Sequence, residues 1–312
     1  MTSLQPGAPD SMQGKTVLVT GGVGGLGMGC ALRFARLGAD LIVADIAEAA
    51  APAALQQLQA AGARAEFLRL DLSDAADVQR VAAGLLARGR PLDVLVNNAG
   101  IYPPSQRTTN AEGHELTLSI AHFGHFRLSH ALWPLLREAP AARVVTISSL
   151  TQRHATMDLA DLALQQGYTP IRAYAQAKLA NLLFALELQR RLEKAGSRVS
   201  SYAAHPGVTR TAIGQNRRKR DDDRWHQRMS TAIFAYWQAR FGQSPEQGAL
   251  PIVLAANSSE FAPGSFLGPV GMLEAFGRIE RVEPGKLAGD PQLAQRLWEH
   301  TEAVTGLRWS FQ

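Results

Sequence analysis

A tyrosine and a lysine one helical turn apart are the residues of this sequence best suited to acid–base chemistry. Tyr174 and Lys178 lie in the segment RAYAQAKLANLLFALELQRRL. At ~3.6 residues per turn, side chains at positions i and i+4 project from the same face of a helix. A phenol with an ordinary pKa near ~10 is a poor base at neutral pH, but a neighbouring ammonium favours the phenolate. The pair could therefore exchange a proton with an alcohol or a ketone.

Such pairs are common on surface helices, so the meaning of this one depends on the elements that precede it. The run TGGVGGLG at residues 20–27 follows a short β-rich segment and opens a helical pattern. Gly21, Gly25 and Gly27 allow a tight turn and let the backbone approach a pyrophosphate, while the helix directs free N–H groups and its positive dipole end at that anion. A lone glycine-rich loop is as often a plain turn. The order strand, loop, helix favours a dinucleotide site here.

An acidic residue, Asp45, ends the second predicted strand. A carboxylate at this place can accept hydrogen bonds from both hydroxyls of the adenosine ribose, and it repels a 2′-phosphate. Ile46 and Ala47, which follow it, carry no positive charge, and Gly24 rather than a basic residue precedes Gly25. The pattern therefore predicts NAD rather than NADP as the cofactor. A helix cap is the weaker alternative for Asp45.

Short apolar runs alternate with helical patterns along the chain. The predicted strands are residues 15–20, 40–46, 65–72, 92–97, 143–148 and 198–204. The predicted helices are residues 26–37, 52–61, 75–88, 112–137 and 171–194. This alternation indicates a parallel sheet covered on both faces, with right-handed crossovers and a ligand crevice at the carboxyl ends of the strands. We predict an α/β fold, a single-domain Rossmann-type doubly wound parallel sheet.

Composition and length suit one large cytoplasmic domain. The chain has 312 residues, 46% of them hydrophobic, and no Pro/Ser-rich linker divides it. Residues 1–11 are predicted to be a disordered N-terminal tail and residues 12–312 the dinucleotide-binding catalytic domain. We recognise neither a signal peptide nor an apolar run of the ~18 residues needed to cross a bilayer. The single cysteine, Cys30, excludes an internal disulfide and suits a reducing compartment.

Two features could suggest nucleic-acid or metal binding, but neither pattern supports it. The net charge is +5, and the basic run at residues 217–220 is followed at once by three aspartates at residues 221–223, so a solvated loop is expected. His122 and His125 have a possible metal-ligand spacing, but no third ligand cluster stands near them in the sequence. We predict no metal site and no nucleic-acid partner.

Several motifs occur together and in order. They are TGxxxGxG, Asp71-Leu72, NNAG at residues 97–100, a serine before the tyrosine, YxxxK, and HPGVTRT at residues 205–211. With this combination the chain resembles the short-chain dehydrogenase/reductase family. It is most similar to the retinol-dehydrogenase and WW-domain-oxidoreductase-like branch, on YAQAKLANLLFALELQRRL, HFGHF, SPEQGALPIVLAA and LWEHTEAVTG. The resemblance extends over about residues 12–307.

The resemblance implies the catalytic roles. Tyr174 is the general acid/base, and Lys178 binds the nicotinamide ribose and lowers the pKa of the tyrosine. Ser149, at the longer spacing before Tyr174 that is typical of the branch, polarises the substrate oxygen. Ser148 is the less favoured alternative, because strand alternation points it the other way. The implied reaction is hydride transfer to or from C4 of nicotinamide. His122, His125 and His205 are expected to be structural.

The resemblance also implies the cofactor contacts. Asp71 and Leu72 would contact the adenine, the run from Asn98 to Gly100 the cofactor ribose, and Thr209 and Thr211 the carboxamide and pyrophosphate region. The predicted cofactor-binding residues are Gly21, Gly24, Gly25, Leu26, Gly27, Asp45, Ile46, Asp71, Leu72, Asn98, Ala99, Gly100, Tyr174, Lys178, Thr209 and Thr211.

One residue departs from the family pattern. In related enzymes an asparagine directly precedes the HxGHF stretch and anchors a water of the proton relay beneath the lysine, whereas this chain has Ala121 there. Ser119 and Asn181 are not obvious replacements. Because the tyrosine, lysine and serine are all present, we expect activity with an altered relay.

The segment after the HPG motif predicts the kind of substrate. WHQRMSTAIFAYWQARF, at residues 225–241, carries apolar residues at helical spacing and so is also consistent with an ordinary amphipathic helix. Family topology implies a substrate lid at about residues 212–245, and an apolar lid would favour a bulky hydrophobic or aromatic alcohol or carbonyl.

The predicted function is that of an NAD-dependent alcohol dehydrogenase/carbonyl reductase, with oxidation as the favoured direction because cells keep NAD mostly oxidised. A non-catalytic dinucleotide-binding regulatory protein on the same fold is the alternative. Epimerase or dehydratase chemistry is disfavoured, because the chain is short of a separate sugar-nucleotide domain. Family precedent implies a homodimer or homotetramer packed through residues 112–137 and 171–194, although a monomer with a covering C-terminal segment is conceivable.

Overall fold

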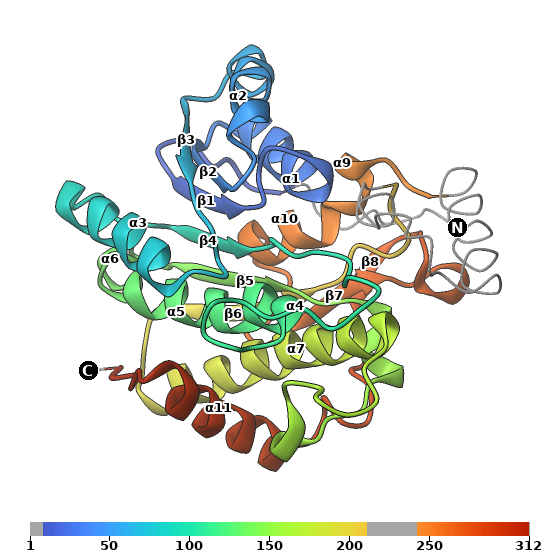
Figure 1. The fold of residues 1–312 in the computed structure, drawn as a ribbon. Helices are drawn as coiled ribbons and strands as arrows, with labels where there is room; N and C mark the ends of the chain where they lie inside the picture. Colours follow the sequence, from blue (N-terminus) through green and yellow to red (C-terminus); the bar gives the residue numbers. More distant parts are fainter. Residues whose placement is uncertain (1–8, 211–241, 312) are drawn as a thin grey trace.

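The computed structural model describes residues 9–210 and 242–311 (Figure 1). Within these residues eight strands form one sheet in the order β3-β2-β1-β4-β5-β6-β7-β8. The strands are β1 Thr16–Thr20, β2 Asp40–Asp45, β3 Ala65–Arg69, β4 Val94–Asn97, β5 Arg143–Ile147, β6 Ser200–Ala204, β7 Phe266–Pro269 and β8 Ile279–Arg281. The first seven run parallel, and β8 pairs antiparallel with β7. The predicted doubly wound α/β sheet is confirmed.

The strand order reverses at the centre of the sheet. From β1 the chain moves outward to β2 and β3, then returns to place β4 on the other side of β1. Loops after β1 and β4 therefore leave in opposite directions, which opens a crevice at the carboxyl ends of the two strands. This switch point is the place where an α/β sheet binds a ligand.

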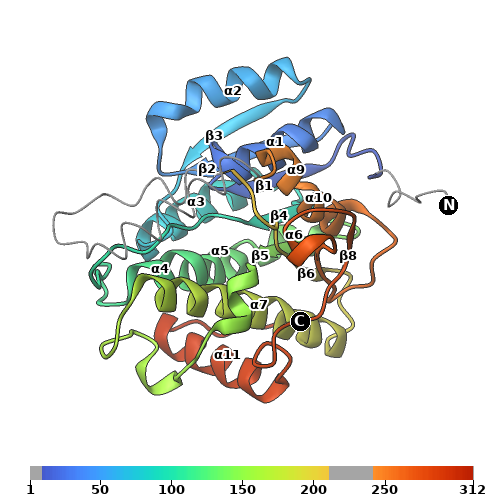
Figure 2. The ribbon, with the colours of Figure 1, turned by 90° about the vertical axis from the view of Figure 1, so that its right-hand side faces the viewer.

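Helices cover both faces of the sheet (Figure 2). The helices are α1 Gly25–Arg36, α2 Ala51–Ala60, α3 Ala75–Arg88, α4 Leu116–Leu118, α5 His125–Ala131, α6 Trp133–Glu138, α7 Pro170–Lys194, α9 Pro245–Gly248, α10 Leu250–Asn257 and α11 Pro291–Thr305. Because successive strand residues point to opposite faces, Val17 and Val19 pack with α1 and α10, while Leu18 packs with α3, α5 and α7. The central strands β1 and β4 are buried on both faces, as parallel strands covered by helices are, whereas the edge strands β3 and β8 are partly exposed and carry charged residues.

The prediction of one continuous helix over residues 112–137 is wrong: the helical structure starts later and is interrupted. Helical structure begins at Leu116, because the carboxylate of Glu115 accepts hydrogen bonds from the backbone N–H groups of Thr117 and Leu118. A π-helical segment, Ser119–Gly124, follows. A break at Leu132 then separates α5 from α6, which has a proline in its first turn. The strand predicted over residues 65–72 is also shorter, since β3 ends at Arg69.

Residues 242–311 contain α9, α10, β7, β8 and α11, elements that the sequence patterns did not assign. In Figures 1 and 2, α11 lies on the side of α7 that faces away from the sheet, where the two helices contact each other. Trp298 of α11 stacks on Phe184 of α7 with ring centroids 5.8 Å apart, and Trp309 and Phe311 continue this aromatic cluster toward α6. The chain's own C-terminal segment therefore covers part of the surface through which an oligomer was predicted.

Most of the predicted N-terminal tail, residues 1–8, lies outside the described residues. The end of that predicted tail is bonded to the domain, because the carbonyl oxygen of Asp10 accepts a hydrogen bond from the Asn257 side chain. Met12, the next residue but one, is buried in the core beneath α1.

Candidate active site

Helix α7 carries both acid–base candidates to the carboxyl end of β5. Thr169 caps the helix by accepting a hydrogen bond from Arg172 N, and Pro170 begins it. Lys178 is buried, and its Nζ donates to the carbonyl oxygen of Ile147, the last residue of β5, at 3.2 Å. The Nζ lies 5.8 Å from the centroid of the Tyr174 ring. The tyrosine and lysine thus share one helix face at the edge of the sheet.

The two serines that follow β5 point to different places. Ser148 is buried, and its Oγ donates to the carbonyl oxygen of Lys178 at 2.8 Å, so it ties β5 to α7. Ser149 is half-buried, caps the 3-10 turn Leu150–His154 and forms a side-chain hydrogen bond with Tyr174. The structure therefore brings together Ser149, Tyr174 and Lys178.

The ionisation of the pair differs from the sequence expectation. Burial raises the pKa of Tyr174 to about 12, and the hydrogen bond with Ser149 only partly opposes that effect. Burial lowers the pKa of Lys178 to about 8. Desolvation penalises both charged forms, so the ammonium does not lower the pKa of the phenol below its ordinary value in this structure. At neutral pH Tyr174 is a proton donor.

The glycine loop lies between β1 and α1 and is shaped to receive an anion. Gly21 and Gly25 have φ values of 64° and 50°, in the left-handed region that favours glycine. A Cβ at Gly27 would collide with the carbonyl oxygen of Gly21, so α1 can approach the turn only without a side chain there. Gly24 and Leu26 complete the turn and the first residues of α1, whose free N–H groups face the switch point. The loop fits the pyrophosphate of a dinucleotide.

Asp45 stands beside this loop at the end of β2. Its carboxylate accepts hydrogen bonds from Val23 N of the glycine loop at 3.4 Å and from Ala47 N at 3.0 Å. The neighbouring Ile46 is exposed. Arg69 is opposite Asp45 in the register of β2 and β3, but its guanidinium pairs with Asp77 at 2.9 Å. The carboxylate is thus not engaged by that cation.

The NNAG run, residues 97–100, lies at the end of β4, on the side of the switch point opposite β2. Asn98 Nδ2 donates to Thr20 O at 2.7 Å, and the Thr20 hydroxyl accepts from the backbone of Asn98 and Ala99. Gly100 lies beside Lys178, whose Nζ would be 3.7 Å from a Cβ at that position. Asn98 therefore holds the end of β4 against the end of β1, and Gly100 leaves room beside the lysine.

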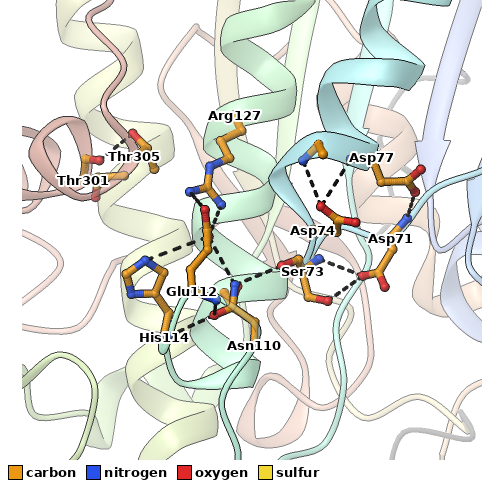
Figure 3. A network of polar contacts seen from close by, with 12 residues as sticks. Asp71, Ser73, Asp74, Asp77, Asn110, Glu112, His114, Arg127, Thr301 and Thr305 are labelled. Carbon is orange, nitrogen blue, oxygen red and sulfur yellow. Dashed lines mark hydrogen bonds and ion pairs between the residues drawn. The ribbon is translucent and has the colours of Figure 1, made fainter.

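Asp71 and Leu72 follow β3 at the same edge. Asp71 Oδ1 accepts from the backbone N–H of Ser73 at 2.9 Å and from its hydroxyl at 2.6 Å. The carbonyl oxygen of Ser73 in turn accepts from Asn110 at 2.9 Å, so a polar network ties this loop to the segment before α4 (Figure 3). Leu72 is buried against Gly124, where a Cβ would collide with the Leu72 carbonyl oxygen.

The segment after β6 carries the last predicted contacts. Thr209 is buried, and its hydroxyl donates to the carbonyl oxygen of Pro206 at 3.1 Å. Thr211 and most of the predicted lid, up to residue 241, lie outside the described residues.

The histidines of the HFGHF stretch are buried packing residues. His125 Nδ1 donates to Ala121 O at 2.9 Å, and its Nε2 lies 2.8 Å from Thr20 Oγ1 behind the glycine loop. His122 Nε2 lies 2.8 Å from Thr301 Oγ1 of α11. Burial lowers their pKa values to about 4 and about 3, respectively, so both are neutral near pH 7. Among the described residues, no group of three or more His, Cys, Asp or Glu side chains could hold a metal ion.

One residue of the site, Tyr102, was missed by the sequence patterns, and a second, Asn181, was judged no obvious replacement for the asparagine missing at Ala121. The ring of Tyr102, in the loop after β4, lies 6.0 Å from that of Tyr174. Asn181, one turn after Lys178, donates from Nδ2 to the same Ile147 carbonyl oxygen at 2.9 Å, and its buried Oδ1 has no hydrogen-bond partner. Tyr102 belongs to no recognisable motif, and the packing of α7 on β5 brings Asn181 beside Lys178.

Similarity to known proteins covers nearly the whole chain. Mouse polyprenol dehydrogenase is 37% identical over 300 residues, covering 94% of this chain and 84% of that protein. Human retinol dehydrogenase 14 is 33% identical, covering 96% of this chain and 89% of that protein. The crystal structure of an uncharacterized protein from Mycobacterium paratuberculosis superposes with a TM-score of 0.78 at 33% identity, covering 97% of both chains.

A family model described as short chain dehydrogenase matches residues 15–222, which include the glycine loop, Ser149, Tyr174 and Lys178. This match covers more than half of the chain and agrees with the strand order and the site geometry. The chain belongs to the short-chain dehydrogenase family.

Proposed function

We propose that this protein is an NAD-dependent oxidoreductase that interconverts a bulky, apolar alcohol and its aldehyde or ketone. The observation that carries the proposal is the convergence of Ser149, Tyr174 and Lys178 at the end of β5, beside the glycine loop. A half-buried phenol next to a hydroxyl and an amine can bind one carbonyl or alcohol oxygen and move one proton.

Each group has a separate task in this mechanism. Ser149 and Tyr174 would hold the substrate oxygen, with Tyr174 giving a proton to it in reduction and taking one in oxidation. Lys178, fixed on the Ile147 carbonyl oxygen, would hold the cofactor ribose and stabilise the deprotonated phenol. The nicotinamide supplies or accepts the hydride when it is bound. The protein contributes orientation and a proton donor.

The ionisation of Tyr174 predicts how the two directions respond to pH. Oxidation requires the phenolate, and the pKa of Tyr174 is raised to about 12. Below that pKa the phenolate fraction increases about tenfold per pH unit. We therefore expect kcat/KM for alcohol oxidation to rise from pH 6 to about pH 8, where Lys178 keeps its charge, and kcat/KM for carbonyl reduction to change little over the same range.

Asp45 supports NAD as the cofactor. Its carboxylate lies next to the glycine loop, where the adenosine ribose of a dinucleotide would bind, and no basic side chain follows it. A 2′-phosphate at this place would face a negative charge. The measurement is kcat/KM with NAD(H) and NADP(H); a preference for NADPH would contradict the assignment.

The substrate class rests on the relatives and on one residue of the site. The two relatives are named for polyprenol and retinol, both long apolar alcohols. Tyr102 adds an aromatic ring beside Tyr174. A panel of isoprenoid, aryl and short-chain alcohols, assayed at the nicotinamide absorbance band, tests this class. Equal kcat/KM for short-chain and long-chain alcohols would exclude it.

Replacement of the phenol separates an enzyme from a regulatory dinucleotide-binding protein. Tyr174→Phe should lower kcat by about 10²- to 10⁴-fold, the usual range for general acid–base catalysis, while NADH binding is retained. If the natural protein binds NADH but neither oxidises nor reduces any member of the panel, the regulatory alternative is favoured.

A further inference from the structure

A strained residue lies in the connection between β7 and β8. Glu274 has a φ of 54°, in the left-handed region that residues other than glycine rarely occupy. It ends the short 3-10 turn Met272–Glu274. Such a conformation persists where the surrounding structure holds it, and it is found preferentially at functional sites.

The Glu274 carboxylate contacts two segments that leave the sheet at neighbouring strands. Its Oε1 accepts from Arg153 Nη2 at 2.7 Å, and Arg153 belongs to the 3-10 turn that Ser149 caps. Its Oε2 faces His205 Nε2 at 3.4 Å, and His205 directly follows β6. One side chain therefore lies between the segment that carries Ser149 and the loop that leads to Thr209.

The histidine contact involves a neutral, fixed ring. His205 is completely buried, and burial lowers its pKa to about 4. Its Nδ1 accepts from Gly207 N at 3.3 Å, so the proton of the neutral ring is on Nε2, which lies 3.4 Å from Glu274 Oε2 in a contact that no hydrogen bond completes. The ring also fills the space over β7, because a Cβ at Gly268 would collide with it.

The backbone next to Glu274 makes the same connection. Ala275 O accepts from Val208 N at 2.9 Å and from Gln243 Nε2 at 2.8 Å. Gly207 approaches this oxygen so closely that a Cβ there would collide with it. On the other side, Arg153 Nη2 also donates to Glu283 O at 3.2 Å. The β7–β8 connection is thus bonded to the Gly207–Thr209 loop through Ala275, and to the Ser149 segment through Arg153 and Glu274.

We propose that Glu274 is a positioning residue of the active site, whose carboxylate holds the Ser149 segment and the Gly207–Thr209 loop in register with each other. It contacts neither Tyr174 nor Lys178, so it acts through Arg153 and His205 rather than in the proton transfer. The proposal rests on the proposed function, because Ser149 there holds the substrate oxygen, and the family resemblance implies that Thr209 contacts the cofactor.

Two substitutions at Glu274 separate positioning from folding. Glu274→Gly removes the carboxylate and also relieves the backbone strain, since glycine readily adopts a positive φ. Glu274→Gln keeps an oxygen for Arg153 but removes the charge. We expect Glu274→Gly to lower kcat by about tenfold or more, on the scale set by small misplacements of catalytic groups, and to weaken NADH binding several-fold. Glu274→Gln should show a smaller loss of kcat.

Glu280→Ala is the matched control, because it removes a carboxylate from the same hairpin whose partner is the exposed Arg278. Its kcat should stay within about twofold of the wild type, as for most surface substitutions. Arg153→Met should reproduce the loss of Glu274→Gly, and the double variant should be no worse than either single one, because both remove one connection.

The outcomes distinguish this proposal from the proposed function. An inactive wild type would contradict the proposed function itself. An active wild type with kcat unchanged in Glu274→Gly, Glu274→Gln and Arg153→Met would overturn the positioning role. A positioning role leaves the pH dependence of kcat/KM unchanged, so a shifted pH profile in Glu274→Gln would also overturn it. If Glu274→Gly does not fold, Glu274→Gln and Arg153→Met decide the question.

Discussion

The part of the chain from β1 to β5 and the part from β6 onward are stabilised by different kinds of contact. From β1 to β5 the cofactor crevice is built mainly from backbone: a glycine turn, free N–H groups of α1 and the Thr20–Asn98 hydrogen bonds. From β6 onward the structure depends on large side chains, with Trp298 stacked on Phe184 of the preceding helix α7 and Glu274 between β7 and β8. Where the backbone needs a positive φ or a close approach, glycine is required, and the glycines form a short motif that can be recognised in the sequence. Residues that pack through their side chains are spread along the chain and form no short motif.

The largest effect on stability is expected at Trp298 in α11, in the part of the chain from β6 onward. Its ring is buried against Phe184, Phe126 and Trp309, and the Arg191 guanidinium lies 4.5 Å from the ring centroid. Trp298→Ala should lower the free energy of unfolding by about 3–5 kcal/mol, through lost contacts and the cavity left behind. Chemical denaturation measures this. Ile171→Ala, at an exposed apolar residue, is the control, and an equal loss there would contradict the assignment.

In the part of the chain from β1 to β5, the largest effect is expected from Gly27→Ala in the glycine loop. The new methyl group would collide with Gly21 O, so the phosphate turn must move. We expect NADH binding, measured by fluorescence titration, to weaken by about a hundredfold, as for a misplacement of roughly 1 Å. Gly84→Ala in α3 is the control, because a Cβ there meets no neighbouring atom. Similar NADH affinities in the two variants would show that the turn does not bind the pyrophosphate.

The buried His122, which contacts Thr301 of α11, predicts a loss of stability in acid. The pKa of His122 is lowered by burial from its ordinary 6.5 to about 3. The unfolded chain therefore binds a proton between those values that the folded chain does not, and stability falls as pH decreases through this window by up to ~1.4 kcal/mol per unit. His122→Gln should flatten the dependence of Tm on pH between 6 and 4. His154→Gln, at an exposed residue, should leave it unchanged.

The smallest effect is expected where the family pattern is broken, at Ala121. Asn181 already donates to the Ile147 carbonyl oxygen beside Lys178, so polar groups remain near the lysine. Ala121→Asn should change kcat by no more than about tenfold, the lower end of proton-transfer effects. Ala121→Val, which fills the same space without a polar group, is the control. A gain of several orders of magnitude would mean that the natural protein is catalytically impaired.

The sequence could predict much of the fold and the identity of the candidate site. Alternation of apolar runs and helices predicted six of the strands within a few residues, and α3 was predicted with the bounds Ala75–Arg88. The π-helical segment, which ends at Gly124 against Leu72, and the break at Leu132 were missed, because an apolar helical pattern does not distinguish them from a continuous α-helix. β7 and β8 were missed because they are short.

The sequence by itself determined which chemistry is available: a tyrosine and a lysine on one helix face, a serine before them, and glycines where a phosphate must approach. These are local requirements, and spacing along the chain is enough to express them. Only the tertiary structure decided the ionisation of the pair, because burial raises the pKa of Tyr174 and lowers that of Lys178. It also decided that Arg153, His205 and Glu274 meet, since contacts between residues far apart in sequence exist only after the strands have assembled.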